Sequence, residues 1–119
     1  MKKITGLLLW AALGLFPAAV SAAEIKGVLL DQACASGDGL KDGQKGALKH
    51  DRDCALMDAC AKSGYGIVTA DDKFLKFDSA GNEKALALLK KTTKADDLRV
   101  KVTGDVTGDQ ITVASITLE

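Results

Sequence analysis

The last third of the chain shows the clearest alternation of hydrophobic and polar residues. This alternation predicts two neighbouring strands, each with one buried face, joined by a turn at Thr107-Gly108-Asp109. In the second strand the hydrophobic positions change parity at Val113-Ala114, which predicts a β-bulge that bends the strand. The inward-facing positions that we expect are Leu98, Val100 and Val102 in the first strand and Ile111, Val113, Ala114, Ile116 and Leu118 in the second.

Patterns earlier in the chain predict three further strands and a helix. Residues 24–30 are expected to form the first strand, and a hairpin turns at Asp71-Asp72 between strands in residues 65–70 and 73–78. Asn82 is the expected N-cap of a helix that runs to Lys91. Gly27, inside the first strand, indicates a bulge or a close approach of another backbone segment.

A second helix is predicted from Asp51 to Lys62. Its aspartates favour the positive N-terminus, and Gly64 suits the residue that follows its end. The spacing of a helical stripe places two sets of residues on different faces. One set comprises Leu56, Ala59, Cys60 and Ser63, and the other comprises His50, Cys54 and Met57. The prediction thus separates Cys54 from Cys60.

The predicted order of elements is strand, cysteine-rich helical segment, two strands, helix and two strands. Five strands with a helix between the third and the fourth is the order of an OB-fold barrel. We therefore predict a mainly β domain of the α+β class. It is a small five-stranded OB-like barrel with antiparallel strands and a Cys-rich helical insertion, residues 31–64, after the first strand.

Several short motifs accompany this order. The stretch from Ser63-Gly64-Tyr65-Gly66 to Leu118 contains Lys76-Phe77-Asp78 and Val102-Thr103-Gly104-Asp105. On these motifs the chain resembles a group of small exported bacterial OB-fold-like proteins of uncharacterised function. The resemblance implies a fold and a compartment, and it implies no activity.

The N-terminus has the pattern of a cleavable signal peptide in residues 1–23. Lys2 and Lys3 precede an apolar stretch at residues 7–16, and Pro17 then introduces small residues. The apolar stretch is too short for a membrane span. We expect a soluble periplasmic protein with a single domain in residues 24–119.

Charge and aromatic content argue against nucleic acid as a partner. The chain has 16 basic and 16 acidic residues, so the loss of Lys2 and Lys3 with the signal peptide leaves two more acidic than basic residues. Only Tyr65, Phe74 and Phe77 remain as aromatic residues. OB barrels that bind single strands use basic grooves and aromatic platforms. We therefore expect an unknown protein or a small ligand as the partner.

Residues 31–64 hold all 3 cysteines and the single histidine. A first interpretation is a structural disulfide, which is common in small exported domains. Cys54 and Cys60 would be about 9 Å apart along a continuous helix, beyond disulfide reach. Cys34 must then take part. Cys60, on the buried stripe, is its predicted partner, and the bridge would contribute about 2–4 kcal/mol.

A second interpretation is a soft-metal site. The thiolates of Cys34, Cys54 and Cys60 and the imidazole of His50 form a donor set that zinc accepts, and the Met57 thioether would favour copper. His50, Cys54 and Met57 are spaced to converge on one face of the predicted helix. The spacing matches no paired C-x-x-C zinc pattern, so the disulfide and the metal site both stay open.

A third interpretation is a thiol-redox protein. Cys54 would lie beside His50 in the first turn of a helix capped by Asp51, where the helix dipole favours a reactive thiolate. The C-x-x-C motif of redox enzymes is missing, and no catalytic pair of carboxylates stands out. We therefore predict a non-catalytic periplasmic binding or accessory module stabilised by a disulfide, with soft-metal binding and thiol redox chemistry as alternatives.

Overall fold

The computed structural model describes residues 23–119, so the predicted signal peptide lies, apart from Ala23, outside the described residues. Five strands form a mixed sheet that closes into a ring in the order β1-β2-β3-β5-β4, which confirms the α+β class and the number of strands. The strands are β1 (Ala23–Asp31), β2 (Tyr65–Val68), β3 (Phe74–Phe77), β4 (Arg99–Thr107) and β5 (Gln110–Leu118).

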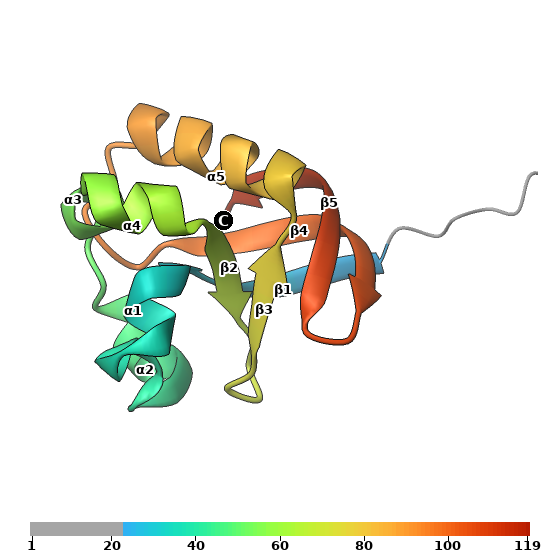
Figure 1. Cartoon of the computed structure of the whole chain (residues 1–119), viewed down its shortest axis with the longest axis horizontal. Coiled ribbons are helices and arrows are strands. Elements are labelled where there is room, and N and C mark those ends of the chain that lie inside the picture. The colour runs from blue at the N-terminus through green and yellow to red at the C-terminus, as the bar shows by residue number, and fades with distance from the viewer. Residues whose placement is uncertain (1–22) are drawn as a thin grey trace, which may run out of the picture.

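Short helices follow β1, and one longer helix lies between β3 and β4. Figure 1 shows the short helices gathered at one end of the molecule, while the longer helix runs alongside the sheet. None of the helices in residues 23–119 has the length and apolar character needed to cross a membrane. The helical elements are α1 (Gln32–Ser36), the 3-10 turn η1 (Asp38–Leu40), α2 (Gly43–Leu48), α3 (Arg52–Ala55), α4 (Asp58–Ser63) and α5 (Ser79–Lys91).

The pairing of β3 with β5 is parallel, and it corrects the expectation of antiparallel strands throughout. The other four ladders, β1–β2, β1–β4, β2–β3 and β4–β5, are antiparallel. Lys76 pairs with Gln110 and Phe77 with Ile111 in the parallel ladder. A closed ring with an odd number of strands cannot alternate direction all the way round. One parallel pair is therefore a geometric requirement of closure.

The predicted bulge in β5 is confirmed. Gly104 of β4 pairs with Val113 and Thr103 pairs with Ser115, which leaves Ala114 as the extra residue. A bulge of this kind raises the local twist and bends the strand. It lies where β5 passes from its contact with β3 to its contact with α5.

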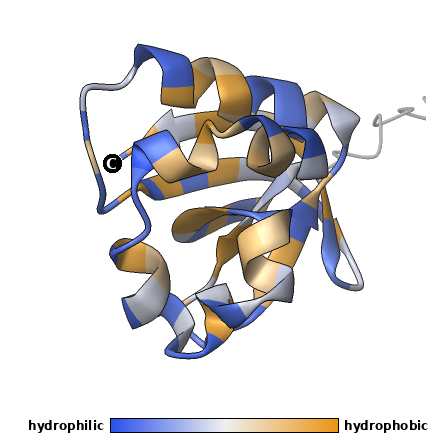
Figure 2. Cartoon of the chain, turned by 60° about the vertical axis from the view of Figure 1, so that its left-hand side comes forward, coloured by the Kyte–Doolittle hydropathy of each residue, from blue (hydrophilic) through white to orange (hydrophobic). Residues whose placement is uncertain are grey.

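The main hydrophobic core fills the space between the inner face of the ring and α5. It includes Leu29, Ile67 and Leu89 and the predicted inward positions Leu98, Val100, Val102, Ile111, Val113, Ile116 and Leu118. Ala114, which was also predicted to face inward, is the extra residue of the bulge and is exposed. A second, smaller cluster lies on the outer face of β1 and β2, where Val28, Leu30 and Val68 pack under α1 and α2. Hydrophobic and hydrophilic stretches alternate along the helices in Figure 2, as expected for elements with one buried side.

Burial on both faces explains the continuous apolar run in β1. A Cβ atom on Gly27 would lie 2.8 Å from Cβ of Ile67 on the neighbouring strand. The predicted close approach at Gly27 is therefore confirmed. β1 ends inside the molecule, and its last residue, Asp31, is covered by the helices that follow.

The start of α5 differs from the prediction. Asp78, rather than Asn82, is the N-cap, and its Oδ1 accepts hydrogen bonds from the backbone nitrogens of Gly81 and Val113. Asn82 lies in the first turn, and its Oδ1 accepts a 2.8 Å hydrogen bond from the backbone nitrogen of Tyr65. Aspartate and asparagine are both good N-caps, so the sequence alone does not distinguish Asp78 from Asn82. In the structure the Asn82 side chain binds the backbone of Tyr65, and Asp78 caps the helix.

Candidate functional site

Asp31 lies at the junction of β1 and α1 and is fully buried. Its Oδ2 accepts a 2.9 Å hydrogen bond from the backbone nitrogen of Cys34, so it is the N-cap of α1. Its Oδ1 accepts a 2.8 Å hydrogen bond from Nε2 of His50, whose side chain is 12% exposed. One carboxylate therefore positions both the helix that carries Cys34 and the imidazole of His50.

The continuous helix predicted from Asp51 to Lys62 is interrupted. Asp51 caps α3 as expected, through a 2.6 Å hydrogen bond from the backbone nitrogen of Cys54. α3 ends at Ala55, and Met57 has an extended backbone (φ −57°, ψ 142°) before α4 begins. The hydroxyl of Tyr65 donates a 2.8 Å hydrogen bond to the carbonyl oxygen of Ala55. That carbonyl would accept the next intrahelical bond in a continuous helix, so the tyrosine takes its place.

The interruption changes which residues face inward. Ala55 is buried, whereas Ala59, which the predicted stripe had placed inside, is exposed. It also removes the premise that a rigid helix holds Cys54 and Cys60 apart. The two cysteines now lie on separate helices that meet at the extended residue Met57.

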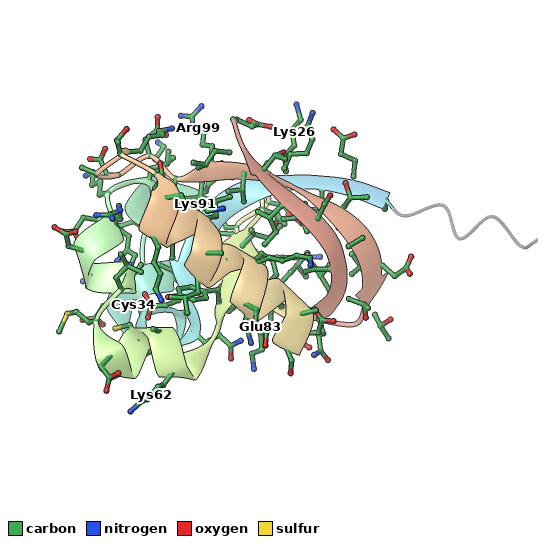
Figure 3. The ribbon with its side chains drawn as sticks, turned by 90° about the horizontal axis from the view of Figure 1, so that it is seen from above. Lys26, Cys34, Lys62, Glu83, Lys91 and Arg99 are labelled. Carbon is green, nitrogen blue, oxygen red and sulfur yellow. The ribbon has the colours of Figure 1, made fainter. Side chains whose placement is uncertain are left out.

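Two groups of potential ligands overlap at Cys34. The ligand atoms of Cys34, His50 and Cys54 all lie within 4.8 Å of one another. The ligand atoms of Asp31, Cys34 and Cys60 form a second group with the same spacing. Figure 3 shows Cys34 at the helical end of the molecule, among the elements that supply these groups. All three thiols are free in this structure.

The predicted ligands do not all lie as the helix pattern places them. Cys60, predicted on a different helix face from Cys54, lies close to Cys34. His50 precedes α3 instead of sharing a helix face with Cys54 and Met57. Met57 is 59% exposed, in contrast to the partly covered cysteines. The arrangement therefore favours thiolates and the imidazole of His50 over the thioether as potential ligands.

Burial and the Asp31 carboxylate keep two of the thiols protonated. Burial raises the pKa of the Cys34 thiol to about 12, and the nearby Asp31 charge adds to this shift. Burial and Asp31 likewise raise the pKa of the Cys60 thiol. A nucleophilic cysteine needs a lowered pKa, so these two thiols are poor nucleophiles. A positively charged ion would have to displace their protons, because thiolates rather than thiols bind metals.

Asp31 itself remains ionised. Burial acts to raise the pKa of its carboxyl group, but hydrogen bonds from His50 and Cys34 outweigh burial and hold the pKa below its ordinary value. A buried carboxylate that orients an imidazole is the usual outer-shell partner of a histidine ligand. Its negative charge also favours a cation at this end of the molecule.

Sequence reasoning missed Asp31. It follows the apolar run of residues 27–30, where a charged residue is expected to mark the exposed end of a strand. One available signal was its place three residues before Cys34. An N-cap side chain accepts a hydrogen bond from the backbone nitrogen at this spacing.

Comparison with known proteins finds no relative. No family model, curated protein or solved structure matches this chain.

Proposed function

We propose that this protein is an exported, non-catalytic binding module that holds a soft or borderline-soft metal ion through Cys34, His50 and Cys54. The observation that carries the proposal is that three donor atoms from three separate segments lie within 4.8 Å of one another. Cys34 comes from α1, His50 from the α2–α3 connection and Cys54 from α3. Cys34 precedes His50 and Cys54 by 16 and 20 residues, so the fold rather than local spacing brings its sulfur to the other two donor atoms.

The donor set fits zinc(II) or copper(I). Two thiolates and an imidazole are ligands that both ions accept, whereas calcium and magnesium prefer oxygen. Cys60 belongs to the second group, with Asp31 and Cys34, and is not one of the three proposed ligands. Three ligands suit copper(I), and with zinc(II) a water molecule would take the fourth tetrahedral position.

Asp31 supports this role without being a ligand to the ion. Its Oδ1 accepts a hydrogen bond from the N–H at Nε2 of His50, so Nδ1 is the ring nitrogen with a free lone pair. The same carboxylate fixes α1 through the backbone nitrogen of Cys34. The ligands are thus held by hydrogen bonds before any ion arrives, which lowers the ordering cost of binding.

The scaffold in this proposal is an OB-like barrel in the periplasm. A closed ring in the order β1-β2-β3-β5-β4, with α5 between β3 and β4, supports the OB-like assignment. The charged N-terminus and apolar stretch of residues 1–23 support export. The segment between β1 and β2 then serves as the ligand-bearing insertion of the barrel.

A competition titration tests the proposed function. The chain, exported from cells with its own leader and then reduced without oxygen, is titrated with zinc(II) and with copper(I) against a coloured chelator. We expect one ion per chain, and Cys34→Ser, Cys54→Ser and His50→Ala should each weaken binding at least about tenfold. Met57→Leu is the control and should bind as the wild type does. Equal affinity in all five proteins, or no binding by the wild type, would overturn the proposal.

A further inference from the structure

Cys34 is shared by two sets of neighbours. Its sulfur lies within 4.8 Å of the ligand atoms of His50 and Cys54 in one group and of those of Cys60 and Asp31 in the other. A sulfur in a disulfide can no longer act as a thiolate ligand. Any bond from Cys34 to Cys60 would therefore remove a ligand from the proposed metal site.

Hydrogen bonds hold the helices of Cys34 and Cys60 together. The backbone nitrogen of Ala33 donates a 3.0 Å hydrogen bond to Oγ of Ser63, and Ser63 Oγ donates a 2.6 Å hydrogen bond to the carbonyl oxygen of Cys60. The backbone nitrogen of Gln32 also donates to the carbonyl oxygen of Gly64, at 2.8 Å. These contacts tie the start of α1 to the end of α4. Cys54, on α3, has no comparable tie to α1 among the described hydrogen bonds.

α4 is separate from the helix that precedes it. Met57 has an extended backbone, so α4 is not continuous with α3. The two sulfurs must approach from within 4.8 Å to the S–S bond length of about 2.05 Å. That shift is under about 3 Å, well below one helical turn. Cys60 is thus a reachable partner that lies outside the group formed by Cys34, His50 and Cys54.

We infer that a Cys34–Cys60 disulfide and the bound metal exclude each other, so that thiol oxidation empties the site. This inference rests on the proposed function. The oxidant is a small-molecule disulfide, such as oxidised glutathione. Cys34, a thiolate while it binds the ion, and Cys60, a thiol, together lose two electrons and one proton and form one S–S bond. The S–S bond of the oxidant breaks, and the oxidant takes up the two electrons, that proton and one proton from water to become two thiols. The metal ion leaves when the lone pair of Cys34 is no longer available.

Mutual exclusion has a measurable consequence for the reduction potential. An ion that binds only the reduced protein stabilises that form by mass action. At an ion concentration 100 times the dissociation constant, the equilibrium between dithiol and disulfide shifts about a hundredfold. A hundredfold shift corresponds to about 59 mV for a two-electron couple. The reduction potential of the Cys34–Cys60 pair should therefore rise by about this amount when zinc is present, which makes the pair harder to oxidise.

The test equilibrates the reduced, zinc-loaded wild type with mixtures of reduced and oxidised glutathione, followed by acid quenching, thiol alkylation and peptide mapping. We expect zinc release to parallel formation of the Cys34–Cys60 peptide. Cys60→Ser keeps Cys34, His50 and Cys54 and should retain zinc at the same potentials. A disulfide-bonded wild type that still holds zinc, a Cys34–Cys54 bridge, or a Cys60→Ser variant that releases zinc as readily would overturn the inference.

The failure of this inference is distinguishable from the failure of the proposed function. If the reduced wild type takes up no ion, the proposed function fails before any oxidant is added. If the reduced wild type binds one ion and keeps it through oxidation, the proposed metal site is supported and the proposed exclusion of metal by the disulfide is wrong. Native mass spectra recorded before and after oxidation separate the two cases.

Discussion

His50 and Asp31 form a hydrogen-bonded pair at the helical end of the molecule. Nε2 of His50 donates a 2.8 Å hydrogen bond to Oδ1 of Asp31, the one buried charged residue within residues 23–119. The pair joins the end of β1 to the α2–α3 connection, 19 residues later in the chain. It therefore fixes the imidazole relative to Cys34, which follows Asp31 in α1.

Asp31→Asn tests the orienting role of this carboxylate. Asparagine keeps the size of the side chain and an oxygen for the backbone nitrogen of Cys34, but it lacks the charge that holds the imidazole. Outer-shell partners of this kind are worth about 10–100-fold in metal affinity, and we expect zinc affinity to fall by that factor. Asp58→Asn, at a position 85% exposed, is the control and should have no effect. Unchanged affinity in Asp31→Asn would contradict the role.

Tyr65 provides a pH test that is independent of any metal. It is the single tyrosine of the chain, and burial, with Asp31 and Cys60 nearby, raises its pKa from 10.0 to about 12. Because the folded state holds the proton more tightly, this contribution to stability is complete below pH 10 and is lost as the pH rises towards 12. Ultraviolet absorbance should show phenolate forming near pH 12. Ionisation near pH 10, with circular dichroism still native, would contradict the burial of Tyr65.

A substitution at Gly66 tests how tightly β2 and β3 pack. A Cβ atom at Gly66 would meet the backbone oxygen of Leu75 and lie 2.6 Å from Cζ of Phe74. We expect Gly66→Ala to lower the free energy of unfolding by about 1–3 kcal/mol in urea denaturation. At Gly37 the nearest atoms lie 3.8 Å away, so Gly37→Ala should change stability by no more than about 0.5 kcal/mol. Equal effects of the two substitutions would contradict the packing.

Substitutions at Asp78 test its role as the N-cap of α5, which the sequence pattern had assigned to Asn82. Its Oδ1 accepts hydrogen bonds from Gly81 at 3.0 Å and from Val113 at 3.2 Å, so it joins α5 to β5. Asp78→Ala should lower the free energy of unfolding by about 1–2 kcal/mol, and Asp78→Asn, which keeps an acceptor oxygen, should lose less. Thermal and urea unfolding measure both variants. An alanine variant as stable as the wild type would contradict the capping role.

The strands and the bulge could be predicted because each depends on a local pattern. Alternation along residues 98–102 and 111–118 identifies the inner face, and the parity change at Ala114 identifies the extra residue. The break between α3 and α4 could not be predicted from the same stretch. The break depends on Tyr65, which lies 10 residues beyond Ala55 in the sequence. The hydroxyl of Tyr65 donates to the carbonyl oxygen of Ala55, which in a continuous helix would accept a backbone N–H, and helix propensity does not include such a long-range contact.

The candidate site could be predicted in part. Cys34, His50, Cys54 and Cys60 are identified by residue type alone, because they are the cysteines and the histidine of the chain. Their arrangement depends on long-range packing: α1 is tied to α4, and α3 to α5 through the 2.7 Å hydrogen bond from Nε of Arg52 to the carbonyl oxygen of Leu89. The buried position of Asp31 depends on the same packing, which has no local signature.

X-ray absorption at the zinc edge of the reduced, zinc-loaded protein tests the metal site most directly, because it reports the ligands themselves. We predict two sulfur ligands at about 2.3 Å and one imidazole at about 2.0–2.1 Å, with one sulfur lost in Cys34→Ser and in Cys54→Ser. The imidazole signal should disappear in His50→Ala, while Met57→Leu should leave the spectrum unchanged. A coordination shell of oxygen and nitrogen alone, unchanged by the cysteine substitutions, would contradict the site.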